Sequence, residues 1–226
     1  MKKYDWILFD ADHTLLDFDR SEAEALSATI QDFGAQATPE ALQTYNRINT
    51  QAWADFQSGK ISREALKVQR FADFLEYLEL RADPAGFGKH YLQMLSRKAY
   101  WLPEAENLIS EIRQHYRIGL ISNGLAEVQR PRFSSIQLFD IFHTVVISGE
   151  IGPAKPDPAF FDYTFRQINH PPREKVLVVG DNLHADIGGG NGYGLDTCWY
   201  NPGGAPPDSI QPTYEVRDIA AVRWIL

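Results

Sequence analysis

Short, mostly apolar runs recur along the chain, and each ends at a polar residue or a glycine. A strand inside a parallel sheet is covered by helices on both faces, so its apolar positions are continuous rather than alternating. The runs of this kind are residues 6–9, 117–121, 144–147, 176–179 and 197–200. Helical periodicity fills much of the chain between the later runs, over residues 103–115, 158–168 and 183–193. This alternation predicts a doubly wound α/β domain around a parallel sheet.

The long interval between the first two runs contains four helical segments, although one helix would suffice to connect two parallel strands. The predicted helix starts are a capping box of Ser21 and Glu24, the pair Thr38 and Pro39, Ser62, and Pro84. We therefore predict two domains. Residues 1–15 and 102–226 form the α/β core, and residues 16–101 form an all-helical domain inserted after the first strand.

The charge and the cysteine content narrow the possible partners. The 226 residues include 22 Lys and Arg against 30 Asp and Glu, which gives a formal net charge of −8. Such a balance does not favour a nucleic-acid polymer as a partner. Cys198 is the one cysteine, which excludes an intramolecular disulfide and favours a reducing cytoplasm. The run 6–9 is too short for a signal peptide or a membrane span, so we expect a cytoplasmic protein without a membrane partner. The sequence does not indicate the oligomeric state.

Polar residues follow the first four runs where those strands should end. They are Asp10, Asp12 and Thr14 after the first run, Ser122 and Asn123 after the second, Lys155 beyond the third, and Asp181 and Asp186 after the fourth. Ligands of open α/β sheets bind outside the carboxyl ends of the strands, so these side chains should meet in one crevice. Carboxylates gathered there repel each other unless a cation lies between them. Oxygen ligands without His or Cys indicate Mg²⁺.

These motifs, taken in order, resemble the four motifs of the haloacid dehalogenase (HAD) superfamily in its phosphatase branch. The matching residues are Asp10-x-Asp12-x-Thr14, Ser122, Lys155 and Gly180-Asp181-x-x-x-x-Asp186. The resemblance implies a HAD-like, Rossmann-type core, with residues 16–101 as a helical cap of the first type. Residues 6–18 and 48–61 and the pair Cys198-Trp199 are also similar to bacterial pyrimidine nucleoside-monophosphate 5′-nucleotidases.

The resemblance further implies a role for each motif residue. Asp10 is expected to attack phosphorus and form an aspartyl phosphate, with Asp12 as general acid and then general base. Lys155 is expected to pair with Asp10 and with the phosphoryl group. The other assignments are phosphate-binding (Ser122, Asn123 and Lys155), metal-binding (Asp10, Asp181, and Asp12 through its backbone carbonyl) and supporting (Thr14 and Asp186).

The function expected from this set is Mg²⁺-dependent hydrolysis of a phosphate monoester. The resemblance implies a pyrimidine nucleoside monophosphate as substrate, such as UMP, dUMP, TMP or a non-standard analogue. A phosphatase or phosphomutase acting on a small sugar phosphate would use the same core motifs. A 2-haloacid dehalogenase would use Asp10 but would need neither Asp12 nor a metal site. A phospho-receiver or an inactive HAD-fold binding module is the non-enzymatic alternative.

Several other residues could take part in function, but a purely structural role explains each of them as well. We expect the His13 ring to face solvent or the cap, and the Cys198 thiol to lie in the core. The glycines between 188 and 194 lack the spacing of a dinucleotide-binding loop and are expected to allow close packing against the sheet. Four aromatic residues could stack on a base, although aromatic stripes are more often core: Phe18, Tyr45, Trp53 and Phe56.

Overall fold

The computed structural model describes residues 3–226 and divides the chain into two compact units. One unit contains the chain through Phe18 and from Ala99 to Leu226, and the other contains Asp19–Lys98. The first is an α/β unit and the second is entirely helical. None of the helices described here is long and apolar enough to cross a membrane. The assignment of residues 16–101 as a cap stays a prediction.

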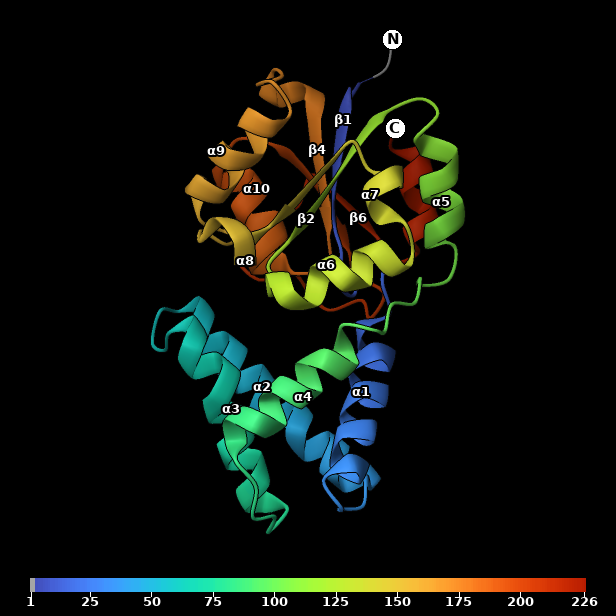
Figure 1. The fold of residues 1–226 in the computed structure, drawn as a ribbon. Coiled ribbons are helices and arrows are strands. Elements are labelled where there is room, and N and C mark those ends of the chain that lie inside the picture. Colours follow the sequence, from blue (N-terminus) through green and yellow to red (C-terminus); the bar gives the residue numbers. More distant parts are fainter. Residues whose placement is uncertain (1–2) are drawn as a thin grey trace. The chain divides into compact units, whose positions relative to one another are not determined.

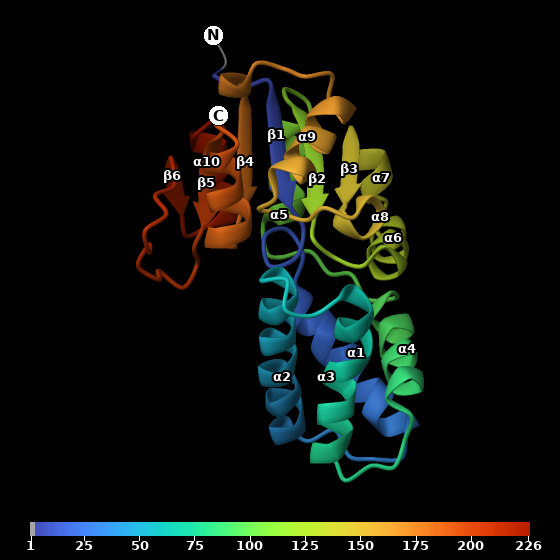
Figure 2. The same ribbon diagram turned by 90° about the vertical axis from the view of Figure 1, so that its left-hand side faces the viewer.

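The α/β unit is built on a six-stranded parallel sheet in the order β3-β2-β1-β4-β5-β6 (Figure 1, Figure 2). Its strands are β1 (Trp6–Asp10), β2 (Arg117–Ser122), β3 (Thr144–Ile147), β4 (Val176–Gly180), β5 (Asp196–Tyr200) and β6 (Tyr214–Val216). The predicted fold class is therefore confirmed. The short edge strand β6 is absent from the prediction, because its three residues Tyr-Glu-Val are too few to form an apolar run.

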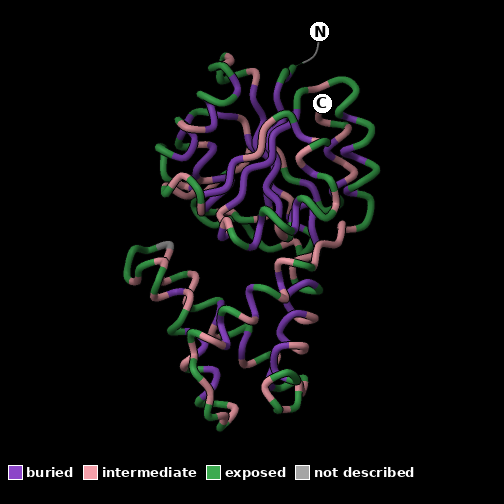
Figure 3. Tube along the Cα trace, in the orientation of Figure 1, coloured by how far each residue is buried: buried purple, intermediate pink, exposed green. Residues whose placement is uncertain are grey.

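Both faces of the sheet are buried, as the continuous apolar runs require. Along β1, Ile7 and Phe9 join one core cluster, while Trp6 and Leu8 join another on the opposite face. This split follows from the geometry of a strand, in which successive side chains point to opposite faces. The strands form the buried centre of the unit in Figure 3. The sheet is thus a rigid support whose carboxyl ends are fixed relative to one another.

Helices cover the two faces of this sheet (Figure 1). They are α5 (Ala105–Ile112), α6 (Ala126–Ser135), α7 (Leu138–Ile141), α8 (Ser148–Ile151), α9 (Pro158–Gln167), η1 (Arg173–Lys175), η2 (Leu183–Gly188), α10 (Gly189–Gly192) and η3 (Ile219–Trp224). The helical segment predicted over 183–193 is confirmed over Leu183–Gly192, with the difference that its first six residues are π-helical and only the last four are α-helical. Its glycines allow close packing, since a Cβ at Gly190 would lie 2.7 Å from Thr197 Cγ2.

The helical unit contains α1 (Phe18–Asp32, whose first residue belongs to the α/β unit), α2 (Pro39–Gln57), α3 (Arg63–Tyr77) and α4 (Pro84–Leu95). The predicted starts of the last three are confirmed, with N-caps at Thr38, Ser62 and Asp83. The predicted capping box is wrong. Because α1 begins at Phe18, Ser21 is buried in its first turn rather than capping it.

Aromatic side chains fill the interior of the helical unit. Tyr45 is fully buried and lies against Phe71, Phe74 and Tyr91, with ring centroids 5.2–5.8 Å apart. Tyr45 therefore belongs to the hydrophobic core of the helical unit, which is the more common role of an aromatic stripe on a helix. A polar cluster lies in the same interior, where the Asn49 amide donates to Glu22 Oε1 at 2.7 Å and the buried Arg70 donates to Asn49 Oδ1.

Candidate active site

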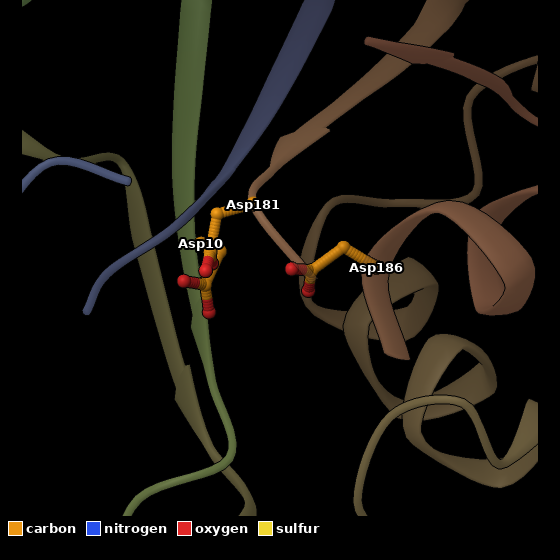
Figure 4. A group of neighbouring side chains, drawn as sticks. All are labelled: Asp10, Asp181 and Asp186. Carbon is orange, nitrogen blue, oxygen red and sulfur yellow. The ribbon is translucent and has the colours of Figure 1, made fainter. Parts of the chain in front are cut away.

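Three carboxylates meet at the carboxyl edge of the sheet. Asp10 ends β1, Asp181 follows β4, and Asp186 lies in η2. Each offers a carboxylate oxygen, and these oxygens all lie within 4.8 Å of one another. Figure 4 shows the Asp186 carboxylate directed toward those of Asp10 and Asp181. The neighbouring strands β1 and β4 mark the point where the strand order reverses, which is the expected ligand site of a doubly wound sheet.

Lys155 is the cation of this cluster. Its Nζ donates to Asp10 Oδ1 at 2.6 Å, to Asp186 Oδ1 at 2.7 Å and to the backbone carbonyl of Ile121 at 2.8 Å. An ammonium group has three hydrogens, so all of its donors are used. Lys155 is only 2% exposed, and these partners offset the cost of burying its charge. The side chain is thereby locked beside the Asp10 carboxylate.

The loop that carries Lys155 is held by Asn123. The Asn123 side-chain amide donates to the backbone carbonyl of Lys155, and its Oδ1 accepts from the Lys155 backbone N–H, both at 2.8 Å. The sequence resemblance assigned Asn123 to phosphate binding. The structure instead directs its side chain to the Lys155 backbone, so phosphate binding by Asn123 stays a prediction that concerns its backbone N–H.

Burial and mutual repulsion disfavour ionisation of Asp10 and Asp181. Burial, with the charges of Asp186 and Asp181, raises the pKa of Asp10 well above 3.8 despite the opposing effect of Lys155. Burial and the Asp186 charge raise the pKa of Asp181 to about 7. Burial alone would lower the pKa of Lys155, but the charges of Asp10 and Asp186 outweigh it and raise this pKa above 10.5. Three carboxylates and one ammonium leave an excess of two negative charges when all are ionised.

Two small residues position the acidic side chains. Thr14 Oγ1 accepts from the backbone N–H of Asp181 at 3.0 Å and lies 3.3 Å from Asp181 Oδ1, to which it donates. This contact fits the supporting role predicted for Thr14. Gly180 has no side chain, and a Cβ there would overlap the Asp186 carboxylate. The close approach of Asp186 to the end of β4 therefore requires glycine at position 180.

Ser122 ends β2 beside the same cluster and is 2% exposed. Its Oγ accepts hydrogen bonds from the backbone N–H of Gly124 at 3.1 Å and from Gln129 Nε2 at 2.8 Å. With both acceptor positions used in this way, the hydroxyl hydrogen is available to donate to a bound anion. This geometry is what a phosphate-binding serine needs.

The carboxylate of Asp12 has partners of its own. Its Oδ2 accepts from Gln129 Nε2 at 2.7 Å, and its Oδ1 lies 2.8 Å from Arg132 Nη1. Asp12 is therefore paired with a second buried cation, Arg132, in addition to the Lys155 that the sequence predicted for this edge of the sheet. The carboxylate cluster capable of holding a metal contains Asp186 where the predicted set has Asp12. Ligation through the Asp12 backbone carbonyl remains a prediction.

The other residues that the sequence singled out lie outside the carboxylate cluster. The His13 ring is exposed and packs edge-on against Phe18, with centroids 5.4 Å apart. Cys198 is buried in the sheet, and burial raises the pKa of its thiol to about 12. Trp53 and Phe56 are half-buried on α2, with ring centroids 5.9 Å apart. They remain candidates for ligand contact, whereas Tyr45 does not.

The donor set fits a hard divalent cation. Buried carboxylate oxygens within one coordination sphere, without imidazole or thiolate, are the ligands of Mg²⁺. A divalent cation would also neutralise the excess of two negative charges described above. Together the switch-point location, the carboxylate cluster and the buried lysine define an α/β enzyme of the kind that handles anionic substrates.

Comparison with known proteins gives the family. The family model for haloacid dehalogenase-like hydrolases matches residues 4–194, and the chain belongs to this family. Pyrimidine 5′-nucleotidase YjjG of Escherichia coli is 36% identical, with 99% of this chain and 98% of that protein aligned. Pyrimidine 5′-nucleotidase PynA of Streptococcus pneumoniae is 35% identical, with 94% of this chain and 91% of that protein aligned. The superfamily resemblance inferred from the sequence is thus confirmed.

A solved structure extends the comparison. The putative HAD-hydrolase YfnB of Bacillus subtilis, crystallised with bound magnesium, is 35% identical and superimposes with a TM-score of 0.94. The alignment covers 99% of each chain. The fold of the present protein is therefore that of a HAD-like hydrolase over 99% of its length.

Proposed function

We propose that the protein is a Mg²⁺-dependent phosphomonoesterase that hydrolyses pyrimidine nucleoside 5′-monophosphates. The observation that carries the hydrolytic part is the clamp of Lys155 on Asp10, beside the carboxylates of Asp181 and Asp186. The names of the relatives YjjG and PynA support the pyrimidine nucleotide as substrate.

In the first step, a carboxylate oxygen of Asp10 attacks phosphorus. The bond from phosphorus to the ester oxygen breaks, and Asp12 donates a proton to that oxygen. The product is an aspartyl phosphate and a free nucleoside. Lys155 fixes the attacking carboxylate and offsets the charge on the phosphoryl oxygens, while Ser122 donates to one of them.

In the second step, water attacks the aspartyl phosphate and Asp12 takes the proton of that water. The bond between phosphorus and Asp10 breaks, its electron pair returns to the carboxylate, and inorganic phosphate leaves. Mg²⁺ bound by Asp10 and Asp181 supplies charge neutralisation at the phosphoryl group. Asp186 holds Lys155 from the opposite side at 2.7 Å.

Base selection is assigned to residues 16–101, the proposed cap, because the core motifs meet only the phosphoryl group. The half-buried Trp53 and Phe56 on α2 are the aromatic residues of this segment that we propose for stacking on a pyrimidine. Stacking of one base on an aromatic side chain contributes about 1–3 kcal/mol. Loss of the base should therefore reduce kcat/KM by roughly ten- to hundredfold.

The test is kcat/KM for thymidine, adenosine and ribose 5-phosphates, measured side by side with Mg²⁺ and with excess chelator. We expect thymidine monophosphate to be the best substrate and chelation to abolish all three activities. Equal values, or a preference for ribose 5-phosphate, would refute the nucleotidase proposal and leave the phosphatase proposal standing. Full activity in chelator would refute the metal site. In Trp53→Ala, a folded protein that has lost its pyrimidine preference would place this side chain at the base.

A further inference from the structure

The Asp12 carboxylate lies in a closed ring of contacts with two residues of α6. Gln129 Nε2 donates to Asp12 Oδ2 at 2.7 Å, and Arg132 Nη1 lies 2.8 Å from Asp12 Oδ1. The same Arg132 Nη1 donates to Gln129 Oε1 at 2.6 Å. Residues three apart lie on one helical face, so α6 presents both side chains to Asp12 together. Asp12 Oδ2 is thereby held by a hydrogen bond, and Oδ1 lies in an ion pair.

The two α6 residues of the ring are buried, whereas the Asp12 side chain is partly exposed. Gln129 is 1% exposed and Arg132 is 0% exposed. A buried guanidinium is tolerated only when it is paired and hydrogen-bonded. Asp12 supplies the charge for Arg132, and the Phe18 ring lies 5.3 Å from the guanidinium carbon. The structural consequence is that α6 is tied to the loop after β1.

The orientation of the Gln129 amide follows from the chemistry of its neighbours. Arginine has donors but no acceptor, so the amide oxygen must face Arg132 and the NH₂ group must face away from it. That NH₂ group reaches Asp12 Oδ2 and Ser122 Oγ, at 2.7 Å and 2.8 Å. A Cβ at Gly124 would lie 2.5 Å from Gln129 Cγ, so the glycine leaves room for this side chain. One amide thus links Asp12 to Ser122.

We propose that Gln129 and Arg132 are positioning residues that hold Asp12 to accept the proton of the water that hydrolyses the aspartyl phosphate. This inference rests on the proposed function. Among the described residues, the Asp12 carboxylate is contacted by donor groups, and neither Gln129 Nε2 nor Arg132 Nη1 competes with it for a proton. The link to Ser122 fixes the distance between this acceptor and the hydroxyl that we expect to hold the phosphoryl group.

Hydrolysis of the aspartyl phosphate transfers one proton from water to Asp12 and exchanges one bond at phosphorus for another. The water oxygen bonds to phosphorus, and its proton passes to a carboxylate oxygen of Asp12. The bond between phosphorus and Asp10 breaks, and its electron pair returns to the Asp10 carboxylate. Asp12 is then protonated and can supply the proton for the ester oxygen of the next substrate. Misplacing Asp12 slows the step in which the phosphoenzyme is consumed.

The experiment compares the wild type with Gln129→Met, which keeps the length of the side chain and removes its hydrogen bonds. With 4-nitrophenyl phosphate, whose leaving group departs without a proton from Asp12, we expect kcat to fall by about 10–100-fold, less than the full contribution of a general base (roughly 10²–10⁴-fold) because Asp12 itself remains. The kcat/KM for this substrate, which reports the first step, should stay within threefold of the wild type. Acid-quenched samples should contain more hydroxylamine-labile phosphoenzyme than the wild type. Arg132→Lys, which retains the positive charge, should show the same signature with a smaller loss.

Arg130→Met is the matched control, because Arg130 lies on the same helix but is exposed and pairs with Glu150. It should leave kcat and the phosphoenzyme level unchanged. A fall of kcat/KM equal to the fall of kcat, without phosphoenzyme accumulation, would overturn the positioning role and indicate a merely structural one. Unchanged kinetics in Gln129→Met would overturn it as well. A wild type that releases no phosphate would refute the proposed function itself.

Discussion

Asp181→Asn should make the metal-free protein more stable above neutral pH. The wild-type carboxyl group is buried beside Asp186, and its pKa of about 7 lies well above the ordinary value of 3.8. Ionising it in the folded state therefore costs free energy that the unfolded chain does not have to supply. The amide of asparagine is nearly the same shape, remains neutral and can still accept from Thr14.

The size of the effect follows from the pKa difference. Each pKa unit corresponds to 1.36 kcal/mol, so a rise from 3.8 to about 7 amounts to about 4 kcal/mol. Below pH 3.8 the Asp181 carboxyl is protonated in both the folded and the unfolded state, so it does not lower the free energy of unfolding. Between pH 3.8 and about 7 the folded state keeps a proton that the unfolded chain has released, so the free energy of unfolding falls as the pH rises through this range. The advantage of Asp181→Asn should accordingly be absent near pH 4, grow through pH 6 and be complete at pH 8.5.

The assay is urea unfolding in EDTA at several pH values, followed by tryptophan fluorescence. Trp53 is the one tryptophan in the helical unit, whereas Trp6, Trp101, Trp199 and Trp224 report on the α/β unit. Asp208→Asn, an exposed site with the same change of charge, is the control and should change stability little. Adding Mg²⁺ should stabilise the wild type more than the variant. A metal-free Asp181→Asn protein no more stable than the wild type at pH 8.5 would show that the carboxylates do not repel as described.

Three further predictions concern other parts of the molecule. Asp10→Asn should reduce turnover by more than about a thousandfold while the circular dichroism spectrum stays unchanged, because the amide is a far poorer nucleophile; turnover within tenfold of the wild type would contradict the assignment. Arg70→Met should destabilise the helical unit by about 3–5 kcal/mol in urea unfolding, because it removes a buried cation that donates to Asn49, which in turn donates to Glu22. Adding Glu22→Gln should recover part of that loss. Cys198 has a thiol pKa of about 12, so it should react with a disulfide reagent at pH 8 only after unfolding, and rapid labelling of the native protein would disprove its burial.

Patterns that depend on neighbouring residues were predictable from the sequence. The strand over residues 144–147 matches β3, and the starts of α2, α3 and α4 follow from local capping chemistry. The motif residues Asp10, Asp181 and Lys155 converge because parallel strands place their carboxyl ends at one edge. Ser21 shows the limit of local reasoning. Its spacing from Glu24 suits a capping box, yet α1 begins at Phe18 and buries the serine.

Gln129 and Arg132 could not have been found in the same way. Their segment, Ala126–Ser135, has weak amphipathic character and contains Pro131, so the periodicity did not predict a helix there. A glutamine and an arginine three residues apart also look like an exposed polar face. Only the tertiary fold shows that this face is buried against Asp12. The one local sign was a pair of polar residues shortly after Ser122, and it is too common to be informative.

The charged side chains of the site therefore form two separate groups, one around Lys155 and one around Arg132. Asp10 shares Lys155 and a prospective cation with Asp181 and Asp186, so its ionisation follows the occupancy of that cluster. Asp12 is instead paired with the guanidinium group of Arg132. Since the two cations are separate, the proposed nucleophile Asp10 and the proposed proton-transfer group Asp12 need not compete for one positive charge. The proposed two-step hydrolysis would benefit from this arrangement, because Asp12 would change its protonation state in each cycle while Asp10 is regenerated as a carboxylate.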